Sequence, residues 1–205
     1  MDQHLTQLLG ELEQFGREND ERASQHSDQL LNITHDTGVF LHLLIQALQA
    51  RRILEIGTSN GYSTLWLADA ARATGGRVRT VEHRPERAEM AAANFARAGL
   101  QAWIEPHTGE AGPYLAALPE DRVDFLFLDA GRGEYPGYWP QLQRVLAPGA
   151  LMVVDNAISH PAEIAPLAAA VQATPGYLTS LVPVGKGELL ILKLPAPTRA
   201  SSEKG

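Results

Sequence analysis

Two aspartates and an asparagine each follow a long apolar stretch of the sequence. Asp129 ends the run VDFLFLD, and Asp155 and Asn156 end the run ALMVVDN. Both runs are typical of buried parallel strands, whose carboxyl ends meet at one edge of a sheet. Two carboxylates and an amide form a set of hard oxygen ligands suited to Mg²⁺, Ca²⁺ or Mn²⁺. The alternative is that Asp155 and Asn156 only cap the following helix.

The stretch ILEIGTSNGYS, residues 53–63, has the pattern of a strand, a glycine turn and a helix start. Gly57 and Gly61 bracket the turn, where glycine permits a positive φ and a close approach of the backbone to a ligand. Ser59 takes the middle glycine position of a dinucleotide motif, which disfavours NAD. Glu82 ends the next strand, where a carboxylate can accept both hydroxyls of a ribose. We therefore expect a nucleoside-containing cofactor. The alternatives are that residues 57–61 form a plain strand-to-helix turn and that Glu82 is a solvated acid at the end of a strand.

Alternating strands and helices are expected to position these residues. After two helices, at residues 1–21 and from Thr37 onward, we expect seven strands: 53–56, 77–82, 102–107, 123–130, 150–155, 178–184 and 188–194. Helices are expected at 85–98, 109–118, 135–146 and 161–173, with a turn at 147–149. This order predicts an α/β fold with a doubly wound, mainly parallel sheet and an antiparallel edge hairpin. We expect one domain over residues 1–195, made of N-terminal helices 1–50 and a core 51–195, and a flexible tail at 196–205.

Composition narrows the functions that remain. The 205 residues carry a formal charge of −7 and no cysteine, which excludes disulfides, zinc thiolate sites and thiol nucleophiles. The acidic balance argues against a nucleic-acid partner. The N-terminal stretch lacks the features of a signal peptide, and no apolar run reaches the roughly 18 residues of a membrane span. We expect a cytoplasmic protein without membrane contact, and the apolar leucines of the N-terminal helices suggest a homodimer contact or a cover for the acceptor site.

Several of these motifs together resemble the class I S-adenosylmethionine (SAM)-dependent methyltransferases. They are LEIGTSNGYST, VEHRPERAEMAAANFARAGL, FLFLDA and VVDN, with the upstream segment NITHDTGVFL. More narrowly, they are similar to the cation-dependent O-methyltransferases, which include catechol and caffeoyl-CoA O-methyltransferases. The similarity covers about residues 30–158. It implies a Rossmann-like fold and methyl transfer from SAM to a hydroxyl group of a small acceptor, assisted by a divalent cation, most simply Mg²⁺.

The resemblance assigns cofactor contacts by position. Glu82 would bind the ribose, and Ile33 would pack beside the sulfonium. The methionine moiety of SAM would be held by Glu55, Gly57 and Ser63.

Further positions follow from the same resemblance. Glu110 and Ala111 would lie near the adenine. Asp129, Asp155 and Asn156 would be the metal ligands, with Asp129 also next to the cofactor and the reacting atoms. With the family pattern, the metal interpretation is favoured over the helix cap.

The sequence departs from these relatives where the acceptor should bind. They usually carry a lysine three residues after the first metal aspartate, whereas this chain has Arg132. Arginine stays protonated and cannot act as a general base, but it can stabilise an oxyanion. The alternative is that Arg132 is a surface loop residue. The segment after Asn156 is also shorter, so catechol specificity is not assumed; His35 and His160 are candidate bases, or simply loop histidines.

Three functional hypotheses remain. The first is a metal-dependent O-methyltransferase acting on a small hydroxylated, catechol-like acceptor. The second is a methyltransferase of the same fold with a vestigial metal site and an acceptor that is not a diol. The third is a SAM-binding protein without catalytic activity.

Overall fold

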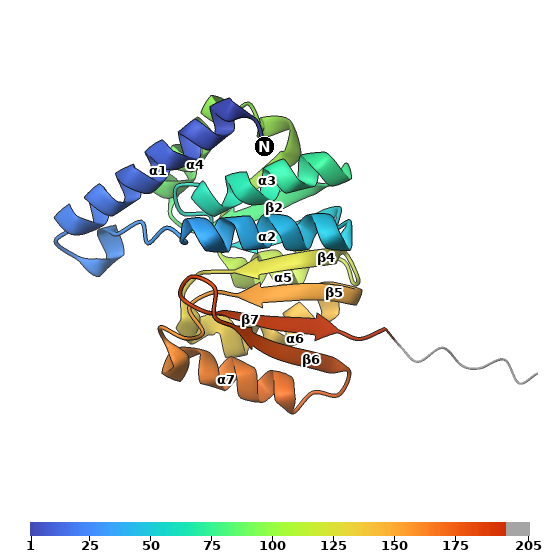
Figure 1. The fold of residues 1–205 in the computed structure, drawn as a ribbon. Coiled ribbons are helices and arrows are strands. Elements are labelled where there is room, and N and C mark those ends of the chain that lie inside the picture. The colour runs from blue at the N-terminus through green and yellow to red at the C-terminus, as the bar shows by residue number, and fades with distance from the viewer. Residues whose placement is uncertain (196–205) are drawn as a thin grey trace, which may run out of the picture.

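The computed structural model describes residues 1–195, which form one seven-stranded sheet with helices on both faces (Figure 1). Two helices precede the sheet: α1 (Gln3–Arg22) and α2 (His35–Leu48). The helices that follow are α3 (Tyr62–Thr74), α4 (Pro85–Ala98), α5 (Ala111–Ala117), α6 (Tyr135–Val145) and α7 (Pro161–Gln172). The strands are β1 (Arg52–Ile56), β2 (Arg77–Glu82), β3 (Ile104–Thr108), β4 (Val123–Leu128), β5 (Leu146–Val154), β6 (Tyr177–Val182) and β7 (Glu188–Lys193). Short 3₁₀ turns are η1 (His26–Asp28), η2 (Gln101–Trp103) and η3 (Arg132–Glu134).

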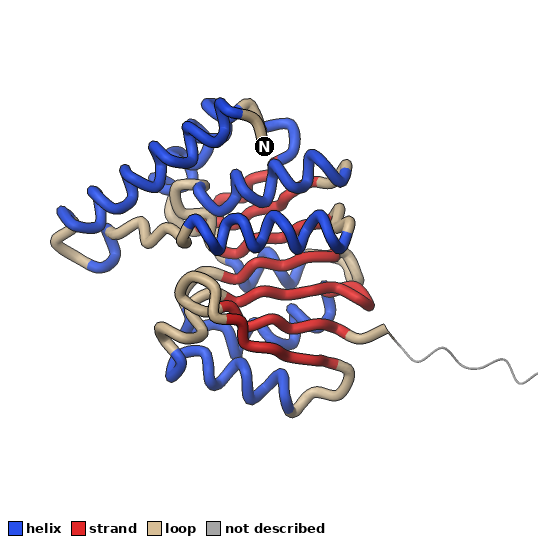
Figure 2. The backbone as a smooth tube through the Cα atoms, viewed as in Figure 1, coloured by secondary structure: helices blue, strands red, loops and turns tan. Residues whose placement is uncertain are grey.

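The strand order in the sheet is β3-β2-β1-β4-β5-β7-β6. Figure 2 shows the strands in red with helices on both faces of the sheet. The first five strands in this order are parallel to one another, and β7 pairs antiparallel with both β5 and β6. The predicted fold, a mainly parallel doubly wound sheet with an antiparallel edge hairpin, is confirmed. Because β1, β2, β4 and β5 run in the same direction, the residues that follow them lie at one edge of the sheet.

Helices cover both faces of the central strands. Because successive side chains of a strand point to opposite faces, they are buried in two separate cores. Ile53 of β1 and Phe125 of β4 belong to a core with α1, α2, α3 and α4, whereas Leu54 and Leu126 belong to a core with α5, α6 and α7. Complete burial of an apolar side chain of this size contributes roughly 1.5–3 kcal/mol. Four leucines attach α1 to the first of these cores: Leu5, Leu8, Leu9 and Leu12.

The segment between α1 and α2 is tied to the end of α1. Asp20 accepts hydrogen bonds from the backbone N–H groups of Leu30 at 2.6 Å and Leu31 at 3.0 Å. The side chain of Thr34 caps α2 by accepting from the backbone of Thr37 at 3.2 Å. The polar stretch of residues 18–29 is therefore helical to Arg22 and then folds back along α1.

The turn expected at residues 147–149 lies inside strand β5. Val123 of β4 pairs with Leu146, and Phe125 pairs with Leu151, so β5 carries extra residues between these two pairs. Gly149 takes up the irregularity with a φ of +83°. The apolar pairing on both sides of this bulge extends β5 beyond the predicted start at residue 150.

The expected homodimer contact remains a prediction. Val39 and Leu43 are exposed on α2, where a homodimer contact would bury them, and light scattering would test for a dimer. Within residues 1–195, no helix combines the length and hydrophobicity needed to cross a membrane. The tail expected to be flexible, residues 196–205, lies outside the described residues.

Candidate active site

A cavity of about 830 Å³ lies where the parallel strands end. It is lined by the segment before α2, the turn after β1, the start of α4, the loops after β4 and β5, and the tip of the β6–β7 hairpin. Seven of the predicted site residues line this cavity together: Ile33, Gly57, Ser63, Glu82, Asp129, Arg132 and Asn156. A smaller cavity of about 560 Å³, at the opposite edge of the sheet, contains none of them.

The turn after β1 packs directly against the end of β4. Gly57 has a φ of +104°, and a Cβ atom at this position would overlap the backbone carbonyl of Asp129. The N–H of Gly57 donates to the carbonyl of Val81 at 3.0 Å. Glycine is therefore required here both by its conformation and by the lack of space for a side chain. The close approach joins the predicted cofactor end of the cavity to its acidic end, which is formed by Asp129 and Asn156.

Glu82 is held in place by the backbone around it. One carboxylate oxygen accepts from the N–H of Ser59 at 2.8 Å, and the other accepts from the N–H of Arg84 at 2.9 Å. His83 lies 3.3 Å from the same carboxylate. Each carboxylate oxygen can accept more than one hydrogen bond, so Glu82 keeps acceptor capacity for ligand hydroxyls.

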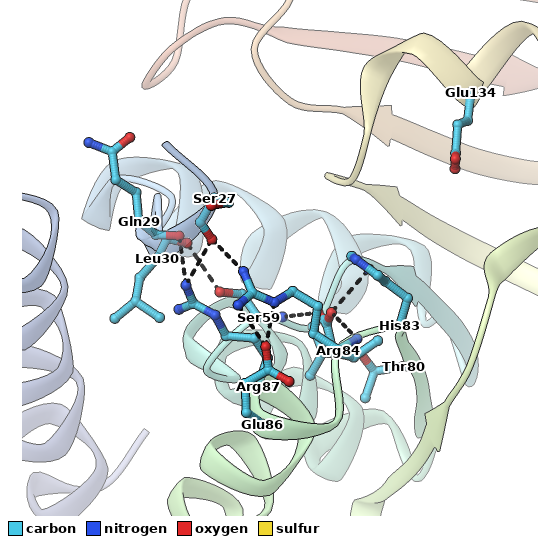
Figure 3. Close-up of polar contacts among 12 residues, drawn as sticks. Ser27, Gln29, Leu30, Ser59, Thr80, His83, Arg84, Glu86, Arg87 and Glu134 are labelled. Carbon is cyan, nitrogen blue, oxygen red and sulfur yellow. Dashed lines mark hydrogen bonds and ion pairs between the residues drawn. The ribbon is translucent and has the colours of Figure 1, made fainter. Parts of the chain in front are cut away.

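Two arginines at the start of α4, the N-cap residue Arg84 and Arg87, were missed by sequence reasoning and hold the segment before α2 (Figure 3). Arg87 donates to the backbone carbonyls of Asp28 at 2.8 Å and Gln29 at 3.0 Å, and Arg84 donates to the carbonyl of Ser27. Ser59 donates to the carbonyl of Leu30 at 3.1 Å. The segment leading to Ile33 is thereby attached to the glycine turn and to α4. The sequence signal was a pair of arginines three residues apart at a helix start, directly after the strand-end acid.

Glu55 lies beneath the turn and does not line the cavity. Its carboxylate accepts from Ser63 at 2.5 Å, from Thr80 at 2.6 Å and from Thr64. Burial raises the pKa of Glu55 to about 7, although these three hydroxyls oppose the shift. Ser63 faces the cavity and is positioned by Glu55, so a direct cofactor contact of Glu55 stays a prediction.

The two residues expected near the adenine lie at the start of α5. Glu110 is the exposed N-cap residue of this helix, and Ala111 is buried as its first residue. Neither lines the cavity. Their assignment also stays a prediction.

The predicted metal ligands lie side by side. The amide nitrogen of Asn156 donates to Asp155 at 2.7 Å and to Asp129 at 3.2 Å. The other Asp155 oxygen, Oδ1, is buried and has no hydrogen-bond partner among the described residues. Burial and the neighbouring Asp155 carboxylate raise the pKa of Asp129 well above its ordinary value, while Lys186 and Arg132 oppose the shift.

The alternative that Asp155 and Asn156 cap the next helix is wrong. Helix α7 begins at Pro161 with His160 as its N-cap residue. Asn156 instead has a φ of +69° and turns the chain out of β5. This conformation directs its side chain back toward the two aspartates.

Another buried carboxyl beside Asp155, that of Glu188, was missed by sequence reasoning. One of its oxygens accepts from Thr37 at 3.0 Å, and the other has no hydrogen-bond partner in residues 1–195. Burial and Asp155 raise the pKa of Glu188. Nowhere in the described chain do three His, Cys, Asp or Glu side chains converge to bind a metal ion, so any ion here depends on Asn156 as well. A glutamate directly before the apolar run LLIL was the available signal.

Positive charge reaches the acidic end from two loops. Arg132 is half-buried in η3, and its Nε donates to the exposed Glu163 at 2.8 Å, so its role at the acceptor stays a prediction. Lys186, at the tip of the β6–β7 hairpin, also lines the cavity and was missed because its hairpin was interpreted only as an edge. Of the two candidate histidines, His160 lines the cavity, whereas His35 lies outside it and packs edge-on against Trp66.

Comparison with known proteins agrees with this architecture. Residues 7–193 match a family model described as O-methyltransferase. A catechol O-methyltransferase from Niastella koreensis is 40% identical over 131 residues, which cover 62% of this chain and 59% of that protein. A catechol O-methyltransferase from Mycobacterium tuberculosis is 42% identical over 126 residues, covering 62% of this chain and 57% of that protein. The match thus spans less than two thirds of the length of these relatives.

Solved structures show the same fold over nearly the whole chain. An O-methyltransferase from Bacillus cereus in complex with SAH has a TM-score of 0.78 at 28% identity, covering 91% of this chain and 90% of that one. An O-methyltransferase from Streptomyces achromogenes, involved in tomaymycin synthesis and solved with SAM, has a TM-score of 0.75 at 29% identity, covering 95% and 91%. With the family model matching residues 7–193 and the sheet carrying the expected residues at one edge, the chain belongs to the O-methyltransferase family.

Proposed function

We propose that this protein is a SAM-dependent O-methyltransferase that methylates a hydroxyl group of a small acceptor, assisted by a divalent cation. The observation that carries the proposal is one cavity that brings Glu82 and Gly57 together with Asp129, Asn156 and Arg132. The ligands named for the related Bacillus and Streptomyces structures, SAH and SAM, support the choice of cofactor. The names of the curated relatives support a catechol-like acceptor.

The residues at one end of the cavity fit a nucleoside. The turn at Gly57 offers backbone without a side chain, and Glu82 offers a fixed carboxylate for ribose hydroxyls. Ile33 is buried at the wall of the cavity and can pack against the sulfonium side. Ser63, held by Glu55, is left to contact the methionine moiety.

The residues at the other end fit a divalent cation. The half-buried Asp129 and the buried Asp155 bring two carboxylates together, and one oxygen of Asp155 lacks a hydrogen-bond partner within the described chain. Such a cluster is costly without positive charge, and hard oxygen donors favour Mg²⁺. Asp129, Asp155 and Asn156 would hold the ion, which would supply the charge that lowers the pKa of an acceptor hydroxyl.

The reaction would move one methyl group from sulfur to oxygen. The S–CH₃ bond of SAM breaks as the O–CH₃ bond forms, SAH leaves, and the hydroxyl proton passes to solvent. The chain would contribute orientation by clamping both ligands in one cavity. Arg132 keeps its proton and is fixed by Glu163, so its contribution would be a positive charge rather than proton abstraction.

One observation favours the alternative without a functional metal. The amide nitrogen of Asn156 already bridges Asp155 and Asp129, and Arg132 and Lys186 add positive charge nearby. In that alternative, the same fold would methylate an acceptor that is not a diol, using these cations alone.

Calorimetry and turnover together test these proposals. SAM would be titrated with and without Mg²⁺, and SAH release would be measured on a panel of catechols and phenols. We expect SAM binding in both conditions and turnover only with the cation. Turnover that is independent of the cation would support the methyltransferase without a functional metal site. SAM binding without turnover would favour a non-catalytic SAM-binding protein. Absence of SAM binding would exclude all three functions.

A further inference from the structure

The β6–β7 hairpin places Lys186 at the acidic end of the cavity. The carbonyl of Lys186 accepts from the N–H groups of Ile158 at 3.1 Å and Ser159 at 3.0 Å. The carbonyl of Gly187 accepts from Ala157 at 2.8 Å, and a Cβ atom at Gly187 would overlap Ile158. The hairpin tip is therefore attached to the loop that directly follows Asn156, and Lys186 is carried by backbone with little freedom to move.

The other lysine and arginine side chains that line the cavity are already engaged. Arg84 pairs with Glu86 at 2.6 Å, and Arg87 binds backbone carbonyls of the segment before α2. Arg132 is paired with Glu163 at 2.8 Å. The Lys186 ammonium has neither an ion pair nor a hydrogen bond to any part of the chain that the structure describes, so its three N–H donors are free for a ligand.

The charges around Lys186 show which part of a ligand it faces. The positive charge of Lys186 opposes the raised pKa of Asp129 more strongly than that of Arg132 does. Ser159 donates from its N–H to the carbonyl of Lys186, and Asn156 at the end of β5 donates to Asp129 at the end of β4. Glu82 ends β2, which β1 separates from β4 in the sheet. Lys186 is thus placed at the acceptor end rather than at the ribose end.

We propose that Lys186 is a catalytic residue that donates a hydrogen bond from its ammonium group to the acceptor oxygen receiving the methyl group. This inference rests on the proposed function. Lys186 keeps its proton throughout: the acceptor hydroxyl proton goes to solvent, the oxygen bears negative charge next to the ammonium, and the O–CH₃ bond forms as the S–CH₃ bond breaks. The ammonium would act by lowering the pKa of the acceptor hydroxyl, and each unit of that shift corresponds to about a tenfold change in the ratio of ionised to neutral acceptor.

The test compares Lys186→Met, which removes the charge, with Lys186→Arg, which keeps it. Arg122→Met serves as the matched control, because Arg122 is exposed at the opposite edge of the sheet. Catechol and 4-nitrocatechol are the acceptors. The nitro group makes the hydroxyl more acidic, so its ionisation depends less on a nearby positive charge such as the Lys186 ammonium. SAM affinity by calorimetry and the thermal midpoint confirm that each variant is folded.

We expect Lys186→Met to lower kcat for catechol at least about 10-fold, because the hydroxyl is less ionised without the ammonium. The variant should lower kcat much less for 4-nitrocatechol and leave SAM affinity unchanged. Lys186→Arg should retain most of the activity. A second readout does not use turnover: in the presence of SAH, the phenolate absorbance of bound 4-nitrocatechol at fixed pH should fall in Lys186→Met, with and without Mg²⁺.

Two results would overturn the inference in different ways. If the wild type is active and Lys186→Met is as active on both acceptors, or is impaired equally on both, the proposed role of Lys186 is wrong. The proposed methyltransferase function would still stand. A wild type that binds SAM but methylates no acceptor would overturn the proposed function, and the inference with it.

Discussion

Gly57 and Asp129 meet at a backbone contact so close that no side chain fits between them. A Cβ atom at Gly57 would overlap the carbonyl of Asp129, and Gly57 also has a φ of +104°. The end of β4 is thereby seated on the turn after β1, and the N–H of Asp129 donates to the carbonyl of Ile56 at 3.0 Å. The position of the first acidic residue thus depends on a glycine more than seventy residues earlier in the sequence.

Gly57→Ala should damage stability and cofactor binding together. The methyl group must displace the backbone of Asp129, and the left-handed conformation adds roughly 1–2 kcal/mol of strain. We expect a thermal midpoint lower by several degrees and a SAM affinity weakened at least about 10-fold. Gly133→Ala is the control, since nothing lies within 4 Å of a Cβ atom there. Equal midpoints for the two variants would show that the contact is not required.

Glu82→Gln should weaken SAM binding without unfolding the protein. Loss of the charge weakens each hydrogen bond from a ribose hydroxyl, and charge-assisted hydrogen bonds contribute about 1.5–3 kcal/mol, or about 10–100-fold in Kd. Calorimetry measures the change. Glu89→Gln, an exposed residue on the same α4, should bind SAM as the wild type does. A Glu82→Gln variant with wild-type affinity would mean that the ribose lies elsewhere.

Glu55 should make the protein less stable as pH rises through the neutral range. Its pKa is raised from 4.5 in the unfolded chain to about 7 in the folded protein, so the folded state binds more protons between these values. Since stability falls with pH where the folded state holds more protons, the loss begins near pH 4.5 and is complete near pH 7. The effect is on the order of 3 kcal/mol.

Urea unfolding across pH 4–8 measures this effect. Glu55→Gln keeps the shape of the side chain but cannot ionise, so it should flatten the pH dependence and match the wild type most closely below pH 4.5. An unchanged slope between pH 4.5 and 7 in Glu55→Gln would assign the pH dependence to other buried carboxyls.

Local patterns predicted the frame of this molecule well, because each element carries its own signal. The helix Pro85–Ala98 begins with proline and ends before Gly99, and its predicted limits agree with the structure. Apolar runs identified β4 and β5 but not the bulge at Gly149, which arises from the register between two distant strands. In the same way, Asp129 and Asn156 could be expected at one edge because each follows a parallel strand.

Residues that depend on tertiary placement escaped prediction. Lys186 and Glu188 lie on a hairpin whose sequence indicates only an antiparallel edge, and hydrogen bonds to the loop after Asn156 bring its tip to the cavity. Arg87 reaches its backbone partners across about sixty residues of sequence. Such contacts follow from how α4 and the segment before α2 pack, and neither periodicity nor spacing encodes them.

The two aspartates should be required for any stabilisation by a divalent cation. We expect Mg²⁺ to raise the thermal midpoint of the wild type, because an ion held by the folded protein and not by the unfolded chain stabilises the fold by mass action. Asp129→Asn should abolish the rise. It should also relieve the repulsion with Asp155, so the variant without Mg²⁺ should be at least as stable as the wild type. Asp36→Asn, exposed on α2, should respond to Mg²⁺ as the wild type does.

A rise of the same size in Asp129→Asn would place the ion elsewhere. No rise in the wild type at millimolar Mg²⁺ would favour the alternative in which Asn156, Arg132 and Lys186 alone balance the charge of the two aspartates.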